Sequence, residues 1–347
     1  MSSFPRLAAA LASVLLASTL AACGEEAPSA SSGALDPANP VKITVADAGY
    51  ANALEIAKAK GYFSKYGLDP KLTQTQSGVA TLAALQGGSL DIGYADFYAG
   101  INALGNGFDI QLVANNNTNL TSLPFLVKSG GPVKTAADLA GKKVGVSPVP
   151  QFIVNTRGFL EANGVDSNRV TFVIIQDATG APQALERGDY DVWAGHWTAA
   201  YSNDGKTGYN FTTVGDTSTK AWSNPDATTA AFWTTGDYAR KHPEIAHAFA
   251  KALYEFHAWW NAVSPSEQAD LVQQYYKIDF KKIAGGDDAK LRNLLPTYYQ
   301  TGPINLDATQ SWYELGLKYA PDKISKGVDW KSHVFASATR SSAGGAP

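Results

Sequence analysis

One order of segments occurs twice in this sequence and limits the folds that it can form. The first copy begins with an apolar run at 42–46, continues through a glycine-containing loop to a helical stretch at 52–60, and ends with a strand-like run at 90–94. The second copy begins at 143–146, roughly a hundred residues later, and ends at 190–193. Because strands that alternate with helices form parallel sheets through right-handed crossovers, each copy predicts a small lobe built on its own sheet.

The clearest echo between the copies lies where a helix gives way to a strand. Residues 84–91 read ALQGGSLD, and residues 184–191 read ALERGDYD. In both segments a helical pattern stops at glycine and an apolar run follows. A chance echo is the alternative, since any α/β chain contains such transitions, but here three elements recur in register in both halves.

Breaks in the pattern predict the lobe boundaries. The segment 129–132, SGGP, interrupts the chain strongly, and the chain returns to an apolar run at 230–233. The fold class is therefore α/β with two lobes, each a small, mostly parallel sheet flanked by helices. We expect lobe I to comprise 41–128 and 232–335, lobe II to comprise 129–231, and the small, polar residues 336–347 to form a disordered tail.

The single cysteine, Cys23, follows a segment that we do not expect to belong to the fold. Arg6 precedes an uncharged apolar run at 7–20, which is shorter than the roughly 20 residues that span a membrane. The run ends in LAACG, which resembles a bacterial lipobox; an ordinary secretory signal before a cysteine is the alternative. We predict a lipoprotein signal peptide at 1–22, acylation of Cys23 with a chain such as palmitate, and a flexible tether at 23–40.

Composition excludes several classes of function. The 28 Lys and Arg residues against 31 Asp and Glu give a formal net charge of -3, which provides no basic footprint for nucleic acid. A single cysteine excludes an internal disulfide, a CxxC redox pair and a multi-thiolate metal site. We therefore expect no nucleic-acid partner, no metal site and no cofactor.

Catalytic motifs are also missing from the sequence. It contains no GxxxxGK[ST] phosphate loop, no GxSxG elbow, no HExxH and no GxGxxG after a strand. His242, His247 and His257 are separated by five and ten residues, which does not place two imidazoles on one helix face. We therefore expect a protein that binds its ligand without converting it.

Aromatic, amide and hydroxyl side chains follow the predicted strands, where ligands of such sheets bind. They suit a small solute, because rings offer stacking area and amides offer hydrogen bonds. Each could instead serve loop packing or turn formation. Two tryptophans on a loop that bound nothing would be unfavourably exposed, so Trp193, His196 and Trp197 rank highest. The candidate ligand-binding residues are Tyr50, Gln76, Ser77, Tyr94, Asp96, Asn116, Gln151, Thr179, Trp193, His196 and Trp197.

Several segments resemble one family of transport proteins. The run 53–68, ALEIAKAKGYFSKYGL, resembles the opening of solute-binding proteins of the nitrate, sulfonate, taurine and thiamine-pyrimidine type. The segments 84–91, 138–146 and 242–244 are similar to the same family, and the likeness covers 41–319. The resemblance implies a periplasmic-binding-protein fold of the second topological class, which closes on its ligand and presents it to the permease and ATPase subunits of an ABC importer.

The expected function is thus that of a monomeric, exported lipoprotein on the extracytoplasmic face of the cell membrane. Its solute would be a small organic molecule such as an aromatic carboxylate or a sulfonate. Family members often hold an oxyanion with N–H groups at the start of the helix after the GKKVGV strand. Here Pro148 and Pro150 remove two of these donors, which argues against a simple sulfonate or nitrate site.

The charge of the solute therefore stays open. Asp96 and Asp177 could pair with a cationic group or cap turns, and Arg157 could meet the ligand or pack between lobes. Two other functions remain as alternatives. One is a pyrimidine-synthase-like or other enzyme on the same fold, although the cysteine-rich motif of that class is missing. The other is an envelope lipoprotein that binds a protein partner with its cleft.

Overall fold

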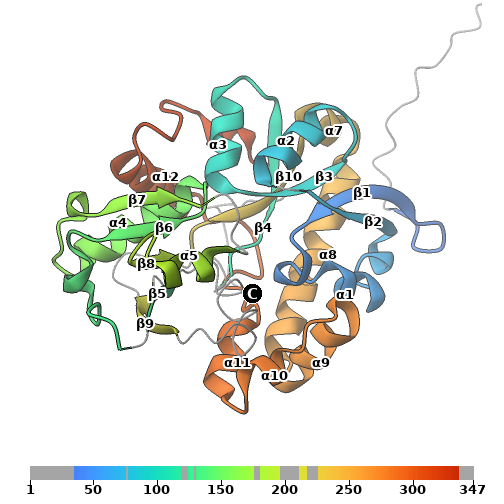
Figure 1. Cartoon of the computed structure of the whole chain (residues 1–347). Coiled ribbons are helices and arrows are strands. Elements are labelled where there is room, and N and C mark those ends of the chain that lie inside the picture. Colours follow the sequence, from blue (N-terminus) through green and yellow to red (C-terminus); the bar gives the residue numbers. More distant parts are fainter. Residues whose placement is uncertain are drawn as a thin grey trace, which may run out of the picture. The chain divides into compact units, whose positions relative to one another are not determined.

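The computed structural model describes residues 35–75, 77–118, 124–128, 130–175, 180–195, 211–216 and 226–335, with only the backbone at 124 and 211–216. Two five-stranded sheets form its framework (Figure 1). The first, in the order β2-β1-β3-β10-β4, consists of β1 (Val41–Asp47), β2 (Leu68–Gln74), β3 (Ile92–Asp96), β4 (Ile110–Asn115) and β10 (Ala230–Thr235). The second, in the order β7-β6-β8-β5-β9, consists of β5 (Pro124–Lys128), β6 (Lys143–Val146), β7 (Thr171–Ile174), β8 (Val192–Ala194) and β9 (Phe211–Asp216).

The two sheets have the same topology, which confirms the predicted repeat. In the first sheet β1 is parallel to both β2 and β3, and in the second β6 is parallel to both β7 and β8. The fourth position in each sheet holds an antiparallel strand from the other half of the chain. That strand is β10 in the first sheet and β5 in the second. The fold is therefore α/β with two mostly parallel sheets.

The structure corrects the predicted boundary between the lobes by one strand. The range 41–128 assigned β5 to lobe I, but β5 pairs with β8 and β9 of the second sheet. The N–H of Gly131 donates to the carbonyl of Lys128, so the glycine-rich break forms a turn directly after β5. The chain rejoins the first sheet at Ala230, two residues before the predicted 232. A short apolar run does not reveal which sheet it will join, because either sheet could bury it.

Helices cover both faces of each sheet, as Figure 1 shows. On the first sheet, α2 and α3 pack with one apolar cluster, and α1 and α8 pack with another. The α-helices are α1 (Leu54–Ala59), α2 (Gly78–Gln86), α3 (Phe97–Gly105), α4 (Pro150–Ala162), α5 (Ala181–Arg187), α7 (Gly236–Lys241), α8 (Pro243–Ala262), α9 (Pro265–Tyr276), α10 (Phe280–Ala284), α11 (Asp288–Leu294) and α12 (Leu306–Tyr319). Short 3-10 helices lie at Gly49–Ala51, Ser64–Tyr66, Ala136–Leu139, Ser167–Arg169 and Trp330–His333.

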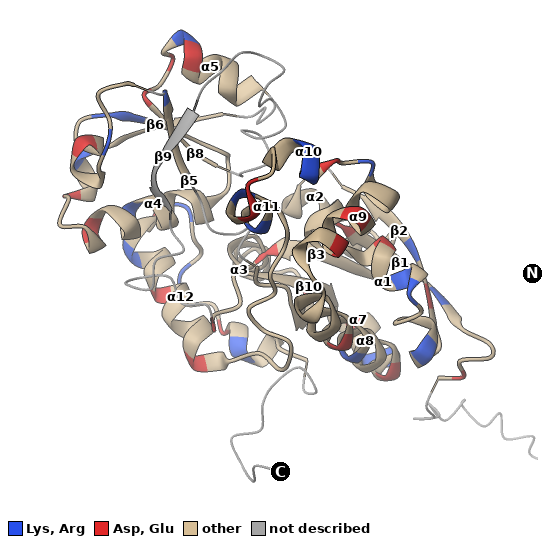
Figure 2. Cartoon of the chain, turned by 90° about the horizontal axis from the view of Figure 1, so that it is seen from below, with Lys and Arg blue, Asp and Glu red and all other residues tan. Residues whose placement is uncertain are grey.

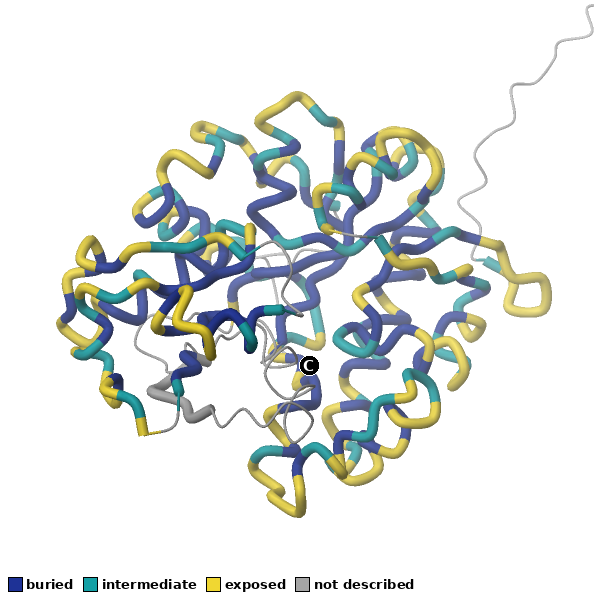
Figure 3. The backbone as a smooth tube through the Cα atoms, viewed as in Figure 1, coloured by how far each residue is buried: buried dark blue, intermediate teal, exposed yellow. Residues whose placement is uncertain are grey.

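The long helix α8, which begins after His242, is amphipathic and buries one stripe of apolar side chains. Ile245, Phe249, Leu253 and Trp260 are all buried along it. Pro243 is accommodated at the start of the helix because the first turn needs no intrahelical donor there. In Figure 3, most strand residues are buried inside, and the exposed residues lie on the loops, at some strand ends and on the outer faces of the helices. Within the described ranges, we find no helix with the length and apolar character that crossing a membrane requires.

Helix α12 contacts α3, which packs on the first sheet, and α4, which packs on the second. The ring of Trp312 stacks on Tyr98 of α3, with centroids 5.1 Å apart, and the Tyr98 hydroxyl donates to the Trp312 carbonyl. At its other end, the Tyr319 carbonyl accepts from Arg157 of α4, and the Tyr319 hydroxyl donates to Glu161 at 2.8 Å. Arg157 therefore serves the packing of α4 against α12, which was one of its two predicted roles.

Candidate functional site

The carboxyl ends of four strands and the start of a fifth meet at one edge of the first sheet. β1 ends at Asp47, β2 at Gln74, β3 at Asp96 and β4 at Asn115. Because β10 runs antiparallel, its first residues pair here too: Ala230 opposes Asp96, and Ala231 opposes Asn115. We call this the carboxyl edge of the first sheet, and it is the place where α/β sheets bind ligands.

The segments at the carboxyl edge carry negative but no positive side chains. The described residues that follow or precede the strand ends are 47–53, 74–75, 94–98, 115–118 and 226–229. They include Asp47, Asp96 and Asp226, and none is Lys or Arg. Elsewhere the two signs are interspersed, as along α12, where Asp307 and Glu314 precede Lys318 (Figure 2). The edge therefore favours a polar or positively charged group over a bare anion.

Asp47 is a buried carboxyl at this edge, with 8% of its surface exposed. Its carboxylate accepts a hydrogen bond from the N–H of Gly49 at 3.2 Å. Burial raises the pKa of Asp47 to about 6, because the charged form loses hydration that one hydrogen bond does not replace. Asp47 was not among the sequence candidates, although its place after a strand could have indicated it.

Two predicted residues, Ser77 and Asp96, cap helices. Ser77 accepts from the N–H of Ala80 at the start of α2, and Asp96 accepts from the N–H of Ala99 at the start of α3. Burial raises the pKa of Asp96 to about 6, although the hydrogen bonds of the cap oppose this shift. Both helix N-termini are thus occupied by side chains of the chain itself, which leaves them less suited to an external oxyanion.

Two buried amides meet beside these carboxyls. The side-chain amide of Asn116, a predicted candidate, donates to Oδ1 of Asn52 at 3.0 Å. Their exposed fractions are 2% and 0%. Asn116 Oδ1 and Asn52 Nδ2 have no hydrogen-bond partner within the described part of the chain. A buried polar atom without a partner is costly, so this pair offers one acceptor and one donor to a water or a solute.

The predicted tyrosines of the first lobe lie near the same edge. Tyr94, on β3, is partly buried and contacts Phe232 edge-on at 5.7 Å between ring centroids. Tyr50 follows β1 and meets Phe280 of α10 edge-on at 5.1 Å. Burial raises the pKa of the Tyr94 hydroxyl, so it is a neutral hydrogen-bonding group. The structure thus brings Tyr50, Tyr94 and Asn116 to one edge of the first sheet.

Two candidate ligand-binding residues, Gln151 and Trp193, lie in the described part of the second lobe, and the position of Trp193 differs from its prediction. Gln151 lies in the first turn of α4 directly after Pro150 and is buried. Trp193 was expected on a cleft loop, but it lies within β8 and is 2% exposed. Its ring packs with Leu185 and Tyr190 in an apolar cluster. β8 lies between β6 and β5, so both of its edges are paired, and its side chains are buried in apolar clusters.

The remaining predicted residues lie outside the described residues. These are Gln76, Thr179, His196, Trp197 and the lipidation candidate Cys23, together with Asp177. Among the residues that the structure does describe, no three His, Cys, Asp or Glu side chains come together in a way that could hold a metal ion.

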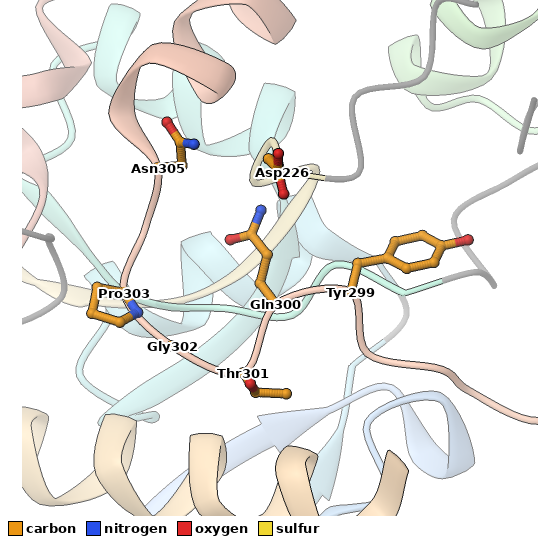
Figure 4. A pocket seen from close by; sticks show the side chains of 7 residues that line it. All are labelled: Asp226, Tyr299, Gln300, Thr301, Gly302, Pro303 and Asn305. Carbon is orange, nitrogen blue, oxygen red and sulfur yellow. The ribbon is translucent and has the colours of Figure 1, made fainter. Parts of the chain in front are cut away.

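A pocket of about 360 Å³ lies beside the carboxyl edge, and sequence analysis did not find it. In Figure 4, the side chain of Gln300 extends toward Asp226, while the ring of Tyr299 points in another direction. The Asn305 side chain accepts from the N–H of Ala308 and so caps α12. The lining residues are Asp226, Tyr299, Gln300, Thr301, Gly302, Pro303 and Asn305.

Hydrogen bonds join this pocket to the end of β4. The side-chain amide of Asn115 donates to the carbonyl of Gly302 at 2.8 Å, and that of Asn117 donates to the carbonyl of Ala227 at 2.8 Å. The N–H of Tyr299 donates to the carbonyl of Asn117 at 3.0 Å. The asparagine run after β4 therefore fixes both walls of the pocket.

Helix α8 holds the loop that carries Gln300. The side chain of Asn261 donates to the carbonyl of Tyr298 at 2.7 Å and accepts from its N–H at 3.0 Å. His257 stacks on the Tyr298 ring with centroids 3.7 Å apart. Burial lowers the pKa of His257 to about 3, so it is neutral. These contacts join residues up to 41 positions apart, and no local sequence signal predicts them.

Comparisons with known proteins identify a family model and a relative that are similar to this chain. A family model described as NMT1/THI5 like matches residues 50–262. The taurine-binding periplasmic protein of Escherichia coli (strain K12) is 29% identical over 223 residues, which cover 63% of this chain and 66% of that protein. The match therefore spans slightly less than two thirds of the relative.

Solved structures show the same fold at lower identity. The periplasmic aliphatic sulphonate binding protein SsuA from Escherichia coli is 18% identical with a TM-score of 0.66, covering 86% of this chain and 99% of that one. The alkanesulfonate-binding protein SsuA from Xanthomonas axonopodis pv. citri, bound to MOPS, is 18% identical with a TM-score of 0.61, covering 85% and 98%. The two sheets of this chain thus form a two-lobed periplasmic-binding-protein fold.

Proposed function

Because the chain belongs to the NMT1/THI5-like family, we propose that it is the solute-binding protein of an ABC importer. Its solute is a small organic molecule, such as an aromatic carboxylate, a sulfonate or a related compound. The lobes close on the solute, and a membrane permease receives it. The match to a taurine-binding protein and the likeness to sulfonate-binding structures support this solute class.

The observation that carries the proposal is the carboxyl edge of the first sheet with its adjoining pocket. There, buried amides with open hydrogen-bonding atoms stand beside tyrosine rings and a cavity of about 360 Å³. A small solute in such a site gains stacking area from the rings and directional hydrogen bonds from the amides. Stacking and hydrogen bonding of this kind are sufficient for reversible binding of a solute.

A thermal-shift and calorimetric screen tests this function. The probes are taurine, ethanesulfonate, MOPS, benzoate and 4-aminomethylbenzoate. A solute present at about 100 times its dissociation constant should stabilise the folded protein by about 2.7 kcal/mol. Asn116→Ala should weaken binding, because it removes an amide of the site, whereas Asn39→Ala in an exposed turn should not. A screen in which no probe raises the melting temperature rejects the proposal.

We further propose that Cys23 carries the lipid that holds the protein to the outer face of the cell membrane. The support is the LAACG sequence after an apolar run. An acyl chain on the mature N-terminus would anchor the protein without spanning the bilayer. Fractionation of cells should find the wild type with membranes and Cys23→Ala in the soluble exported fraction. Equal partition of the two proteins would rule the anchor out.

A further inference from the structure

We propose that one face of the first lobe lies against the anionic phospholipid headgroups of the membrane. None of its residues belongs to the segments of the carboxyl edge, so membrane contact is a property apart from solute binding. The position of this face relative to the membrane rests on the proposed anchor at Cys23, whereas the chemistry of its side chains does not. Six side chains form the face, which we call the aromatic-basic patch: Lys60, Tyr62, Lys65, Tyr66, Lys251 and Trp259.

Ring contacts join the two sides of the aromatic-basic patch. α1 and α8 pack on the same apolar cluster beside the first sheet (Figure 1). After α1, Tyr62 contacts Trp259 of α8 with ring centroids 5.9 Å apart, and the Nζ of Lys60 lies over the Trp259 ring at 5.3 Å. Both rings are partly buried, so each keeps one part on the protein and one part in solvent. Tyrosine and tryptophan held in this way suit the headgroup region of a bilayer, because their rings are amphipathic.

The lysines give the patch a net positive charge. Lys65 pairs with Glu255 at 2.7 Å, and the Tyr66 hydroxyl donates to the same carboxylate. Lys60 and Lys251 are exposed and make no ion pair within the described ranges, and the Nζ of Lys251 lies over the Tyr66 ring at 5.1 Å. Three lysines against one glutamate leave an excess of two positive charges, on a chain whose formal net charge is -3. An anionic lipid surface attracts such lysines.

The chain enters the folded body beside this patch. Leu35 packs on the same apolar cluster as Tyr66, and a Cβ atom on Gly67 would come within 2.7 Å of the Leu35 Cβ. Asp36, the acid at this entry, accepts hydrogen bonds from its own turn. Leu35 follows Cys23 by twelve positions, which span at most about 40 Å when fully extended. A lipid on Cys23 would therefore hold the face around Leu35 close to the bilayer, and the patch belongs to that face.

Lysine footprinting on the anchored protein tests the inference. Because the sequence contains one cysteine, the chain that begins at Cys23 can be coupled by its thiol to a maleimide phospholipid in vesicles. Residues 33–347 form a compact unit by themselves, so this chain retains the fold. Mass spectrometry then follows the acetylation of each lysine by an activated ester. The vesicles contain either phosphatidylcholine alone or equal parts of phosphatidylcholine and phosphatidylglycerol.

Acetylation of Lys60 and Lys251 should be about tenfold or more slower on the vesicles with phosphatidylglycerol, because two unpaired lysines favour contact with an anionic surface. Lys143, an exposed lysine on β6 of the second sheet, should react at the same rate on both kinds of vesicle. Salt at about 0.5 M should remove the protection, because it screens exposed charges.

The matched variants are Lys60→Gln and Lys143→Gln, which each remove one exposed charge. Lys60→Gln should weaken the protection of Lys251 about fivefold, and Lys143→Gln should leave it unchanged. Circular dichroism and melting temperature establish that both variants are folded.

Equal acetylation of Lys251 on the two kinds of vesicle would overturn the inference. So would protection that depends on the density of protein and not on phosphatidylglycerol, which would indicate contact between copies of the chain. Neither outcome affects the proposed solute binding or the lipid on Cys23, because the solute screen and cell fractionation test these separately.

Discussion

Replacement of Trp193 with alanine should lower the free energy of unfolding by about 3–5 kcal/mol, the usual cost of removing a buried tryptophan. The side chain is 2% exposed and packs with Leu185 and Tyr190. Its ring also lies against Gly195, where a Cβ atom would come within 2.0 Å of it. The void left by alanine would lie inside this buried cluster of side chains, and the cost of such a cavity adds to the lost apolar burial.

Urea denaturation of the wild type and Trp193→Ala measures this loss, and Trp193→Phe is the matched control. Phenylalanine retains most of the apolar volume, so it should cost much less than alanine. The sequence alone predicts that Trp193 contacts the ligand. That prediction implies a different result for the alanine variant, namely weaker binding without a loss of stability. If Trp193→Ala kept the stability of the wild type and lost solute binding, the ring would be a ligand contact and the packing argument would fail.

Asp47→Asn should change the pH dependence of stability. Burial raises the pKa of Asp47 to about 6 in the folded protein, against about 3.9 in an unfolded chain. Between these values the unfolded state loses its proton first, so the wild type loses stability as the pH rises through this window. The loss is complete above the folded pKa. Asparagine has no proton to lose and can still accept from the N–H of Gly49.

The difference in unfolding free energy, variant minus wild type, should therefore increase by roughly 2 kcal/mol between pH 4 and pH 7. Chemical denaturation at both pH values measures it directly. The comparison cancels the titration of every group that the two proteins share. Parallel pH profiles for variant and wild type would show that Asp47 titrates as an ordinary carboxyl, and a difference that falls with pH would show a lowered pKa.

Local sequence patterns were sufficient to predict most of the framework. Glycine ends α5 at Gly188 in a left-handed conformation, which a Cβ would disfavour, so the helix end is visible in the sequence. The apolar runs of β1 and β6 begin each repeat, and both form interior strands with a parallel neighbour on either side. In α8 the apolar residues recur at helical spacing, and this local pattern coincides with the buried face. In each case the signal and the structure involve residues close together in the chain.

The candidate site was only partly predictable. Tyr94, Asp96 and Asn116 follow or end strands, and strand ends place them at one edge wherever the sheet is parallel. Asp226 and Gln300 are 74 positions apart, and they share a pocket because Asn117 and Asn261 bind the backbone on either side. Trp193 shows the reverse error, since a side chain expected in the cleft as a ligand contact is buried within the second sheet.

The sequence by itself determined that this chain forms two similar α/β lobes, because strand and helix periods and glycine stops are properties of neighbouring residues. Only the tertiary structure decided that β5 and β10 exchange sheets, that Trp193 is enclosed, and that Asp226 faces a cavity. These outcomes depend on which distant segments cover which surface. Which side chains are buried or hydrogen-bonded between such segments depends on the packing of the complete folded chain, because each surface can pair with several alternative segments.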